Sequence, residues 1–342
     1  MYTEEDISSA VEAGILTTEA ATAFRAYIAA NKGETPVDEE HFRLITGFND
    51  LFVVIACLLI LLSVAWIGAV PARWIGAISV AVVAWFLAEF FVRKRQMALP
   101  AIVLSVTFIG SVLASVFLLS ENTGIAVVIG ISIACALAMI AAWLHWLRFH
   151  VPITIALGVA AGLAAVVALL TVVIPNAKNW PTTLLLICGL VVFALALRWD
   201  ASDTARRTRR SDVAFWLHLL AAPLLVHPLF ALLGVLRGET TIGQAASVIA
   251  LYVAMAFIAL CINRRALMVS ALAYVLYVFS TVLKQYGVVS LNLAIAALII
   301  GSALLLLSAF WHTSRAYALR LLPIAARAPA RAHLPSVKTR GE

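Results

Sequence analysis

Residues 74–95 read WIGAISVAVVAWFLAEFFVRKR, an apolar run of helical length that ends in three consecutive cations. A helix needs about 20 apolar residues to cross a hydrocarbon core of roughly 30 Å. Similar runs recur along the chain, which is 64% hydrophobic and only 12% charged. Soluble domains carry about 25% charged residues. The sequence therefore predicts an all-α fold, a polytopic transmembrane helical bundle.

The positions of the cations predict how this bundle is oriented. The chain has 24 Lys and Arg residues, and they concentrate in alternate gaps between the apolar segments. The exceptions are Arg73, Lys178, Arg237 and Lys284. Because cation-rich loops remain in the cytoplasm, both termini are predicted to lie inside, which requires an even number of crossings. We expect about ten helices, at 51–69, 74–92, 97–119, 123–144, 151–174, 180–197, 213–236, 242–262, 266–283 and 289–311.

Three regions follow from this division. Residues 1–48 are predicted to form a cytoplasmic helical hairpin followed by an interfacial helix, residues 49–314 the transmembrane bundle, and residues 315–342 a basic cytoplasmic tail. The hairpin offers one thin apolar seam, which is too little for an independently stable domain. We therefore expect residues 1–33 to bind a cytoplasmic protein partner.

Two parts of the bundle, residues 49–146 and 211–312, resemble each other. Asn49-Asp50 and Ser211-Asp212 open corresponding segments, and Ile75-Gly76 corresponds to Ile242-Gly243. Four crossings in each copy would make the copies parallel, with the fifth and sixth crossings between them. This predicts a parallel 4+2+4 internal repeat. The alternative is that segments rich in Leu, Ala and Val align by chance.

The seventh crossing has the most unusual polar composition. His218 lies about two turns from its start, and Pro223, His227 and Pro228 follow. Each proline removes a backbone N–H from the helical ladder, and freed carbonyls at membrane depth need other partners. We interpret these four residues as candidates for a pathway or a hinge. The alternative is that the histidines only bond a freed carbonyl or a neighbouring helix.

Acidic residues are the other polar candidates. Glu89 lies inside the second crossing, four residues before Arg93, so it is either a functional carboxylate or one half of a helical ion pair. Asp50 and Asp212 begin their crossings and are predicted to cap them. No other acid falls well inside a crossing as drawn, which argues against a proton- or sodium-coupled pump.

Several kinds of chemistry have no signature in the chain. It contains no Walker A loop, no HExxH, no Gly-x-Ser-x-Gly and no Cys-x-x-Cys. We therefore expect no catalytic residue, no metal and no cofactor. The net charge of +7 concentrates at membrane edges, so anionic lipid headgroups at the cytoplasmic face are the expected partners, and nucleic acid is not. Assembly into a homo-oligomer stays open.

The stretch 209–223, RRSDVAFWLHLLAAP, continuing to Val226-His227-Pro228, resembles a signature of uncharacterised bacterial inner-membrane proteins. The segment 11–17, VEAGILT, resembles the helical hairpin that opens some of these families. The resemblance implies a multi-pass protein of the bacterial cytoplasmic membrane. It implies no known activity, and no site residue is carried over from it.

Two functions are compatible with these features. The first is a permease-like protein for a small solute, with the seventh crossing lining the route. The second is a membrane scaffold or sensor that does not transport and whose N-terminal hairpin binds a cytoplasmic partner. An enzymatic activity has no support in the sequence.

The orientation can be tested with reporter fusions. Fusions at Asn122, Lys178 and Gly238 are expected to report a periplasmic position, because these residues lie in the cation-poor gaps. Fusions at Lys94 and Thr208 are expected to report the cytoplasm. A cytoplasmic signal at Lys178, with the other signals unchanged, would contradict the fifth and sixth crossings.

Overall fold

The computed structural model describes residues 4–31, 48–174, 176–203, 208–234 and 242–262, together with single positions between 272 and 320. Every element in these residues is helical, and they contain no strand. The chain divides into two compact units, of which the first holds α1 and α2 and the second holds the helices from α3 onward. The prediction of an all-α protein is confirmed for the described part of the chain.

The first unit is a helical hairpin, as predicted. α1 spans Glu4–Glu12 and α2 spans Thr18–Asn31. Gly14 ends the first helix in the left-handed region, at φ +71°, where glycine avoids a steric penalty. The hydroxyl of Thr17 accepts a hydrogen bond from the Ala20 amide at 3.1 Å and so caps the second helix. The interfacial helix expected before residue 48 lies outside the described residues.

The second unit contains seven helices that are long and apolar enough to cross a membrane, which makes the protein a multi-pass membrane protein. Their bounds agree with the expected crossings to within a few residues. The helices are α3 (Phe48–Ala69), α4 (Arg73–Ala88) with a π-helical extension η1 (Glu89–Lys94), α5 (Ala98–Asn122), α6 (Val127–Phe149), α7 (Ile153–Val173), α8 (Pro181–Ala201) and α9 (Arg209–Leu232).

An eighth helix, α10 (Ile242–Ile262), covers the next expected crossing. Its apolar part, Ala246–Ile262, is shorter than those of the other seven. The crossings expected at 266–283 and 289–311 and the tail at 315–342 lie largely outside the described residues. The internal repeat, half of which falls there, and the orientation of the bundle therefore remain predictions.

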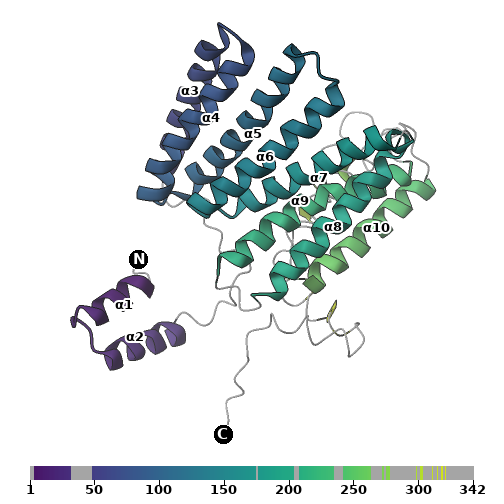
Figure 1. Cartoon of the computed structure of the whole chain (residues 1–342). Helices are drawn as coiled ribbons and strands as arrows, with labels where there is room; N and C mark the ends of the chain where they lie inside the picture. The colour runs from purple at the N-terminus through teal and green to yellow at the C-terminus, as the bar shows by residue number, and fades with distance from the viewer. Residues whose placement is uncertain are drawn as a thin grey trace. The chain divides into compact units, whose positions relative to one another are not determined.

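Short connections place α3 to α7 side by side in chain order and α8 beside α9, whereas α7 packs on α9 more than on α8 (Figure 1). Local backbone chemistry explains where several of them turn. Gln96 after η1 and His150 after α6 adopt left-handed conformations, at φ 52° and φ 54°. Pro181 occupies the first position of α8, where its missing N–H costs no helical hydrogen bond. A short 3-10 turn, η2 (Ala177–Asn179), precedes it.

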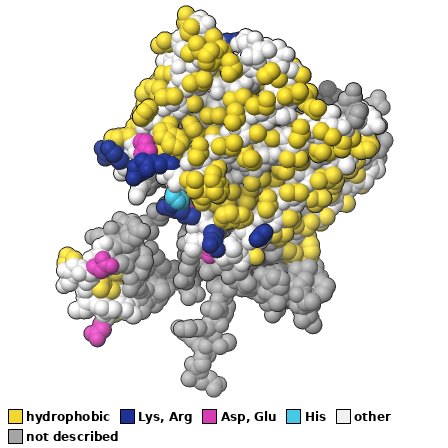
Figure 2. Space-filling model, in the orientation of Figure 1, with side chains coloured by type: hydrophobic (Ala, Val, Ile, Leu, Met, Phe, Trp, Pro, Cys, Tyr) yellow, Lys and Arg dark blue, Asp and Glu magenta, His cyan; other side chains and the backbone are white. Residues whose placement is uncertain are grey.

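Apolar side chains cover the visible face of this unit (Figure 2), as expected for a surface in contact with lipid. In the same view most Lys and Arg side chains gather toward one end. The helices differ in how deeply they are buried. Of the apolar stretch of α9, 56% is buried, against 17–33% in the other six candidate spans. α9 is therefore the most enclosed helix of the described bundle.

α9 is enclosed by several neighbours. Val213, Leu217 and Ala221 pack with α7 and α8 in one apolar cluster. Further along the helix, Val226 and Phe230 pack with residues of α10 in a second cluster. The two prolines of α9 lie within this enclosed segment, and the helix continues through both of them.

A glycine allows α8 to approach α9 closely. A Cβ atom added to Gly189 would lie 2.8 Å from the carbonyl carbon and oxygen of Leu224, which is closer than real Cβ atoms come. Leu224 precedes Pro228 by four residues, and Pro228 has no N–H to donate to that carbonyl. The absence of a side chain at Gly189 thus leaves room for α8 beside a carbonyl that the proline deprives of its usual donor.

We predict that Gly189→Ala lowers the stability of the purified protein, by about 1–3 kcal/mol, because a methyl group must displace backbone atoms of α9. Gly110→Ala in α5 is the matched control. A Cβ at Gly110 meets nothing within 4 Å, and alanine is favoured over glycine within a helix by roughly 0.5–1 kcal/mol. Thermal denaturation in detergent should show a lower midpoint temperature than that of the natural protein for Gly189→Ala only. Equal midpoints would contradict the close α8–α9 contact.

Candidate functional site

A buried pair of titratable side chains joins α8 to α9. The Nε2 atom of His218 lies 2.9 Å from Oδ2 of Asp200. The imidazole is fully buried, and the carboxyl side chain is 6% exposed. Both residues belong to candidate membrane spans. Both titratable side chains of this pair are therefore shielded from solvent.

The helical repeat brings each partner to the shared interface. On α8 the buried residues recur every three or four positions, at Gly189, Val192, Ala196 and Asp200, so they share one face. That face is made of small or branched apolar residues until its last member, which is a carboxylate. The Phe193 ring lies edge-on to the His218 ring, with centroids 5.6 Å apart. The pair thus lies in an apolar contact between two helices.

A second carboxylate lies just after α8 and bonds the residue before α9. Oδ2 of Asp203 accepts hydrogen bonds from the Thr208 amide at 2.8 Å and from the Thr208 hydroxyl at 2.6 Å. The Thr208 hydroxyl in turn accepts from the Arg210 amide and is the cap of α9. The prediction that Asp212 caps this helix was therefore wrong in position. Asp212 lies in the first turn, where a negative charge still complements the helix dipole.

Asp50 occupies the corresponding place in α3. It lies in the first turn of that helix and is buried. Its position favours the predicted structural role, because a carboxylate near the first backbone amides is stabilised there.

The chemistry of the Asp200–His218 pair depends on protons. A carboxylate only accepts hydrogen bonds, so the hydrogen between Nε2 and Oδ2 belongs either to the imidazole or to a protonated carboxyl group. A neutral imidazole beside a carboxylate carries one negative charge, and one further proton makes the pair neutral. Since net charge is costly in an apolar interior, uptake of that proton and the packing of α8 on α9 must influence each other.

Sequence reasoning missed Asp200. The sixth crossing was expected to end at residue 197, whereas α8 continues to Ala201, because Arg198, Trp199 and Asp200 do not interrupt a helix. Asp200 is thus an acid buried within the protein in the last turn of α8, and the argument against proton coupling did not take it into account. The signal that could have revealed Asp200 is the spacing of Gly189, Val192 and Ala196, which places residue 200 on the same face.

The other candidates on α9 do not join the pair. His227 and the side chain of Pro223 are exposed, whereas Pro228 is buried. His218 and His227 are nine positions apart, which places them on different faces of one helix. The structure thus brings His218 together with Asp200, and it does not bring the two histidines together.

Glu89 is held by two arginines at the end of α4. Its carboxylate accepts hydrogen bonds from Arg148 Nε at 2.6 Å and Nη2 at 3.1 Å. The predicted contact with Arg93 is present but longer, at 3.4 Å. Two parallel bonds to a guanidinium give a specific geometry, so Glu89 chiefly links α4 to α6. The structural interpretation of Glu89 fits this arrangement, and Arg148 is the partner that sequence reasoning missed.

A second buried histidine lies in an aromatic cluster. His145 of α6 is fully buried, and its ring lies 5.9 Å from Trp85, 5.4 Å from Phe108 and 4.5 Å from Phe149, between centroids. Among the described residues, neither ring nitrogen of His145 has a hydrogen-bond partner. His145 was not among the candidate site residues predicted from the sequence.

Metal binding has no support at either histidine. Within the described ranges, no three His, Cys, Asp or Glu side chains are grouped so that they could hold an ion. The Asp200–His218 pair remains the strongest candidate site of the described residues, because it combines burial, two titratable groups and a position on the most enclosed helix.

We predict that Asp200→Leu and His218→Leu each lower stability by about 3 kcal/mol, because each leaves one buried polar group without its partner. The double variant should lose less stability than the two single variants lose together, since replacing both side chains leaves neither of them unpaired. Denaturation of the four proteins in detergent measures this coupling. His227→Leu, an exposed change on the same helix, is the control and should have little effect. Additive losses would show that the two side chains do not interact.

Comparison of the chain with protein-family models, with curated proteins and with solved structures finds no match in any of the three. The resemblance of residues 209–228 to bacterial inner-membrane proteins therefore remains a prediction.

Proposed function

We propose that the protein is a permease-like carrier of a small solute, and that protonation of the Asp200–His218 pair is linked to solute movement. The observation that supports this most directly is the 2.9 Å contact between the two buried side chains. A titratable pair inside a membrane helix interface costs stability compared with apolar residues. Its presence on the most enclosed helix is more readily explained by a proton-linked function than by stability.

The linkage would act through the packing of α8 on α9. The pair changes its net charge by one when a proton binds, and the close Gly189–Leu224 contact lies on the same interface. A small shift between the two helices would change how well the charged pair is shielded. The proton would therefore favour one arrangement of α8 and α9 over another, which is the kind of bias a carrier needs.

The setting of this function is also a proposal. Seven apolar helices support a multi-pass membrane protein, and the alternation of cation-rich gaps favours about ten crossings with both termini in the cytoplasm. The bacterial cytoplasmic membrane is the location that the resemblance of residues 209–228 favours.

Proton-linked transport can be measured in proteoliposomes that enclose a pH-sensitive dye. Amino acids, sugars, organic acids and amines are added outside one at a time, with an inward proton gradient. At least one class should acidify the lumen faster with the natural protein than with empty vesicles, and Asp200→Asn should abolish this difference. Glu121→Gln, a corresponding acid-to-amide change at an exposed position of α5, serves as the control and should keep it. The proposal fails if no solute moves protons or if Asp200→Asn leaves the flux unchanged.

A second candidate is a membrane scaffold or sensor, and the N-terminal hairpin supports it. Ile15 is 79% exposed, and Leu16 and Phe24 are also exposed, which leaves apolar side chains available to a protein partner. A photo-crosslinker at Ile15 should then join a specific cytoplasmic protein, whereas one at the polar position Glu12 should not. Crosslinking at Ile15 without any proton-linked flux would favour this function over the first.

A further inference from the structure

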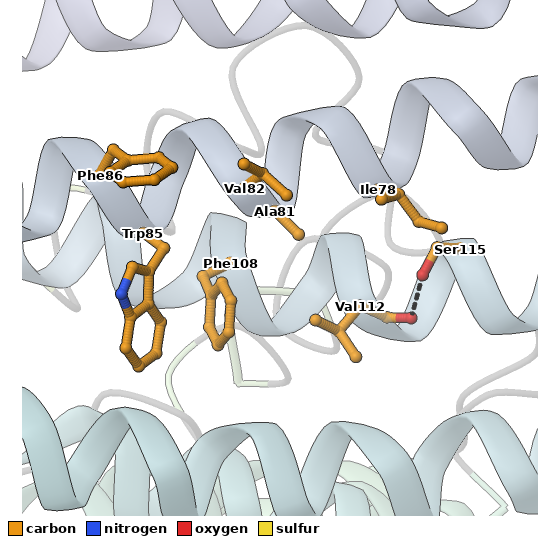
Figure 3. Close-up of a pocket in the computed structure, with 8 residues that line it drawn as sticks. All are labelled: Ile78, Ala81, Val82, Trp85, Phe86, Phe108, Val112 and Ser115. Atoms are coloured by element: carbon orange, nitrogen blue, oxygen red, sulfur yellow. Dashed lines mark hydrogen bonds between the residues drawn. The ribbon is translucent and has the colours of Figure 1, made fainter.

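A shallow apolar groove runs between α4 and α5. Its volume is about 310 Å³, and its lining includes Ile78, Val82 and Phe86 from α4 and Phe108 and Val112 from α5 (Figure 3). The one hydroxyl in the lining, that of Ser115, donates to the Val112 carbonyl at 2.8 Å. The indole N–H of Trp85 is the other polar side-chain group in the lining. The groove therefore offers a mostly apolar surface, as a hydrocarbon chain requires.

The groove continues along α4 toward one end of the helix. Ile78, Val82 and Phe86 are four positions apart and partly exposed, with Phe86 at 69%. Four-residue spacing keeps them in one row on the helix surface. The next member of the row is Phe90, which is also exposed and is the second residue of the π-helical segment η1.

The π-helical turn places a cation at the end of this row. In η1 the amide of Arg95 bonds the carbonyl of Phe90 at 3.1 Å, and such i→i+5 bonding aligns residues five apart. In a regular α-helix, residues five apart lie on different faces. The guanidinium of Arg95 accordingly lies over the Phe90 ring, 5.7 Å from its centroid. The apolar row therefore ends under a fixed positive charge.

The charge around this end is strongly positive. Arg93, Lys94, Arg95 and Arg148 lie there, and Glu89 is the acid that pairs with two of them, Arg93 and Arg148. Lys94 and Arg95 are exposed and make no ion pair within the described part of the chain. Two cations are thus available to a negatively charged group at the membrane edge.

We infer that this surface binds one anionic phospholipid, with an acyl chain in the α4–α5 groove and the phosphate beside Lys94 and Arg95. The apolar row selects a molecule with a hydrocarbon chain, and the two available cations select a negative headgroup. Basic pockets between transmembrane helices commonly bind such headgroups. A protein partner is a poorer fit, because the groove lies within the apolar, lipid-facing stretch of a candidate span.

Native mass spectrometry of the full chain in detergent tests this site. Phosphatidylglycerol and phosphatidylcholine with identical acyl chains are the probes, so that only the headgroup charge differs. The natural protein should retain phosphatidylglycerol preferentially. The double variant Lys94→Gln/Arg95→Gln should bind phosphatidylglycerol roughly 20- to 30-fold more weakly, or about fivefold for each cation removed. Arg73→Gln, at the opposite end of the same helix, is the matched charge control and should leave binding unchanged.

A second pair of variants tests the groove. Val82→Trp should fill it and weaken the binding of both lipids, whereas Val166→Trp, at an exposed position of α7, should not. Glycerol 3-phosphate, which carries the phosphate without acyl chains, should fail to compete. Equal retention of the two lipids, equal loss in Arg73→Gln, unchanged binding in Val82→Trp or competition by glycerol 3-phosphate would each overturn the inference.

Discussion

Polar groups inside a bilayer have no water to bond, and the way α9 meets this constraint organises the described bundle. The helix carries two prolines and a histidine, all of which call for partners beyond the regular backbone ladder. The neighbouring helix α8 bonds the histidine and lies close to the carbonyl that Pro228 leaves without its usual donor. Asp200 of α8 reaches His218, and Gly189 allows the same helix to lie against the Leu224 carbonyl. α9 is thus buried through apolar packing on its neighbours together with one polar contact to α8.

Much of the fold followed from the sequence, because hydrophobic segments of fixed length are imposed by membrane thickness. Eight of the expected crossings correspond to helices in the described residues. The site was only half predicted. His218 was identified because a histidine in an apolar run is conspicuous, whereas Asp200 was missed because hydropathy places a crossing's end at the first charged residue. Burial on a helix face depends on the neighbouring helix, which hydropathy along one segment does not report.

Two charged contacts at helix ends show why a residue's partner is harder to predict than its position. Glu89 was expected to pair with Arg93 on its own helix, and it pairs more closely with Arg148 on α6. Asp212 was expected to cap α9, and Thr208 does so while bound to Asp203. Spacing along one helix predicts contacts within that helix. Contacts between helices depend on which helices pack together in the folded bundle, and spacing along one helix does not specify that.

The α8–α9 hairpin has a consequence for biogenesis. It is fastened at its tip by Asp203 and Thr208 and within its span by Asp200 and His218. If either helix entered the membrane alone, its titratable side chain would face hydrocarbon, at a cost of about 2.5–3.5 kcal/mol for an aspartate at the centre of a helix and less toward its ends. Entry of the two helices as a preassembled pair avoids that cost. The hairpin is therefore suited to partition from the translocon as one unit.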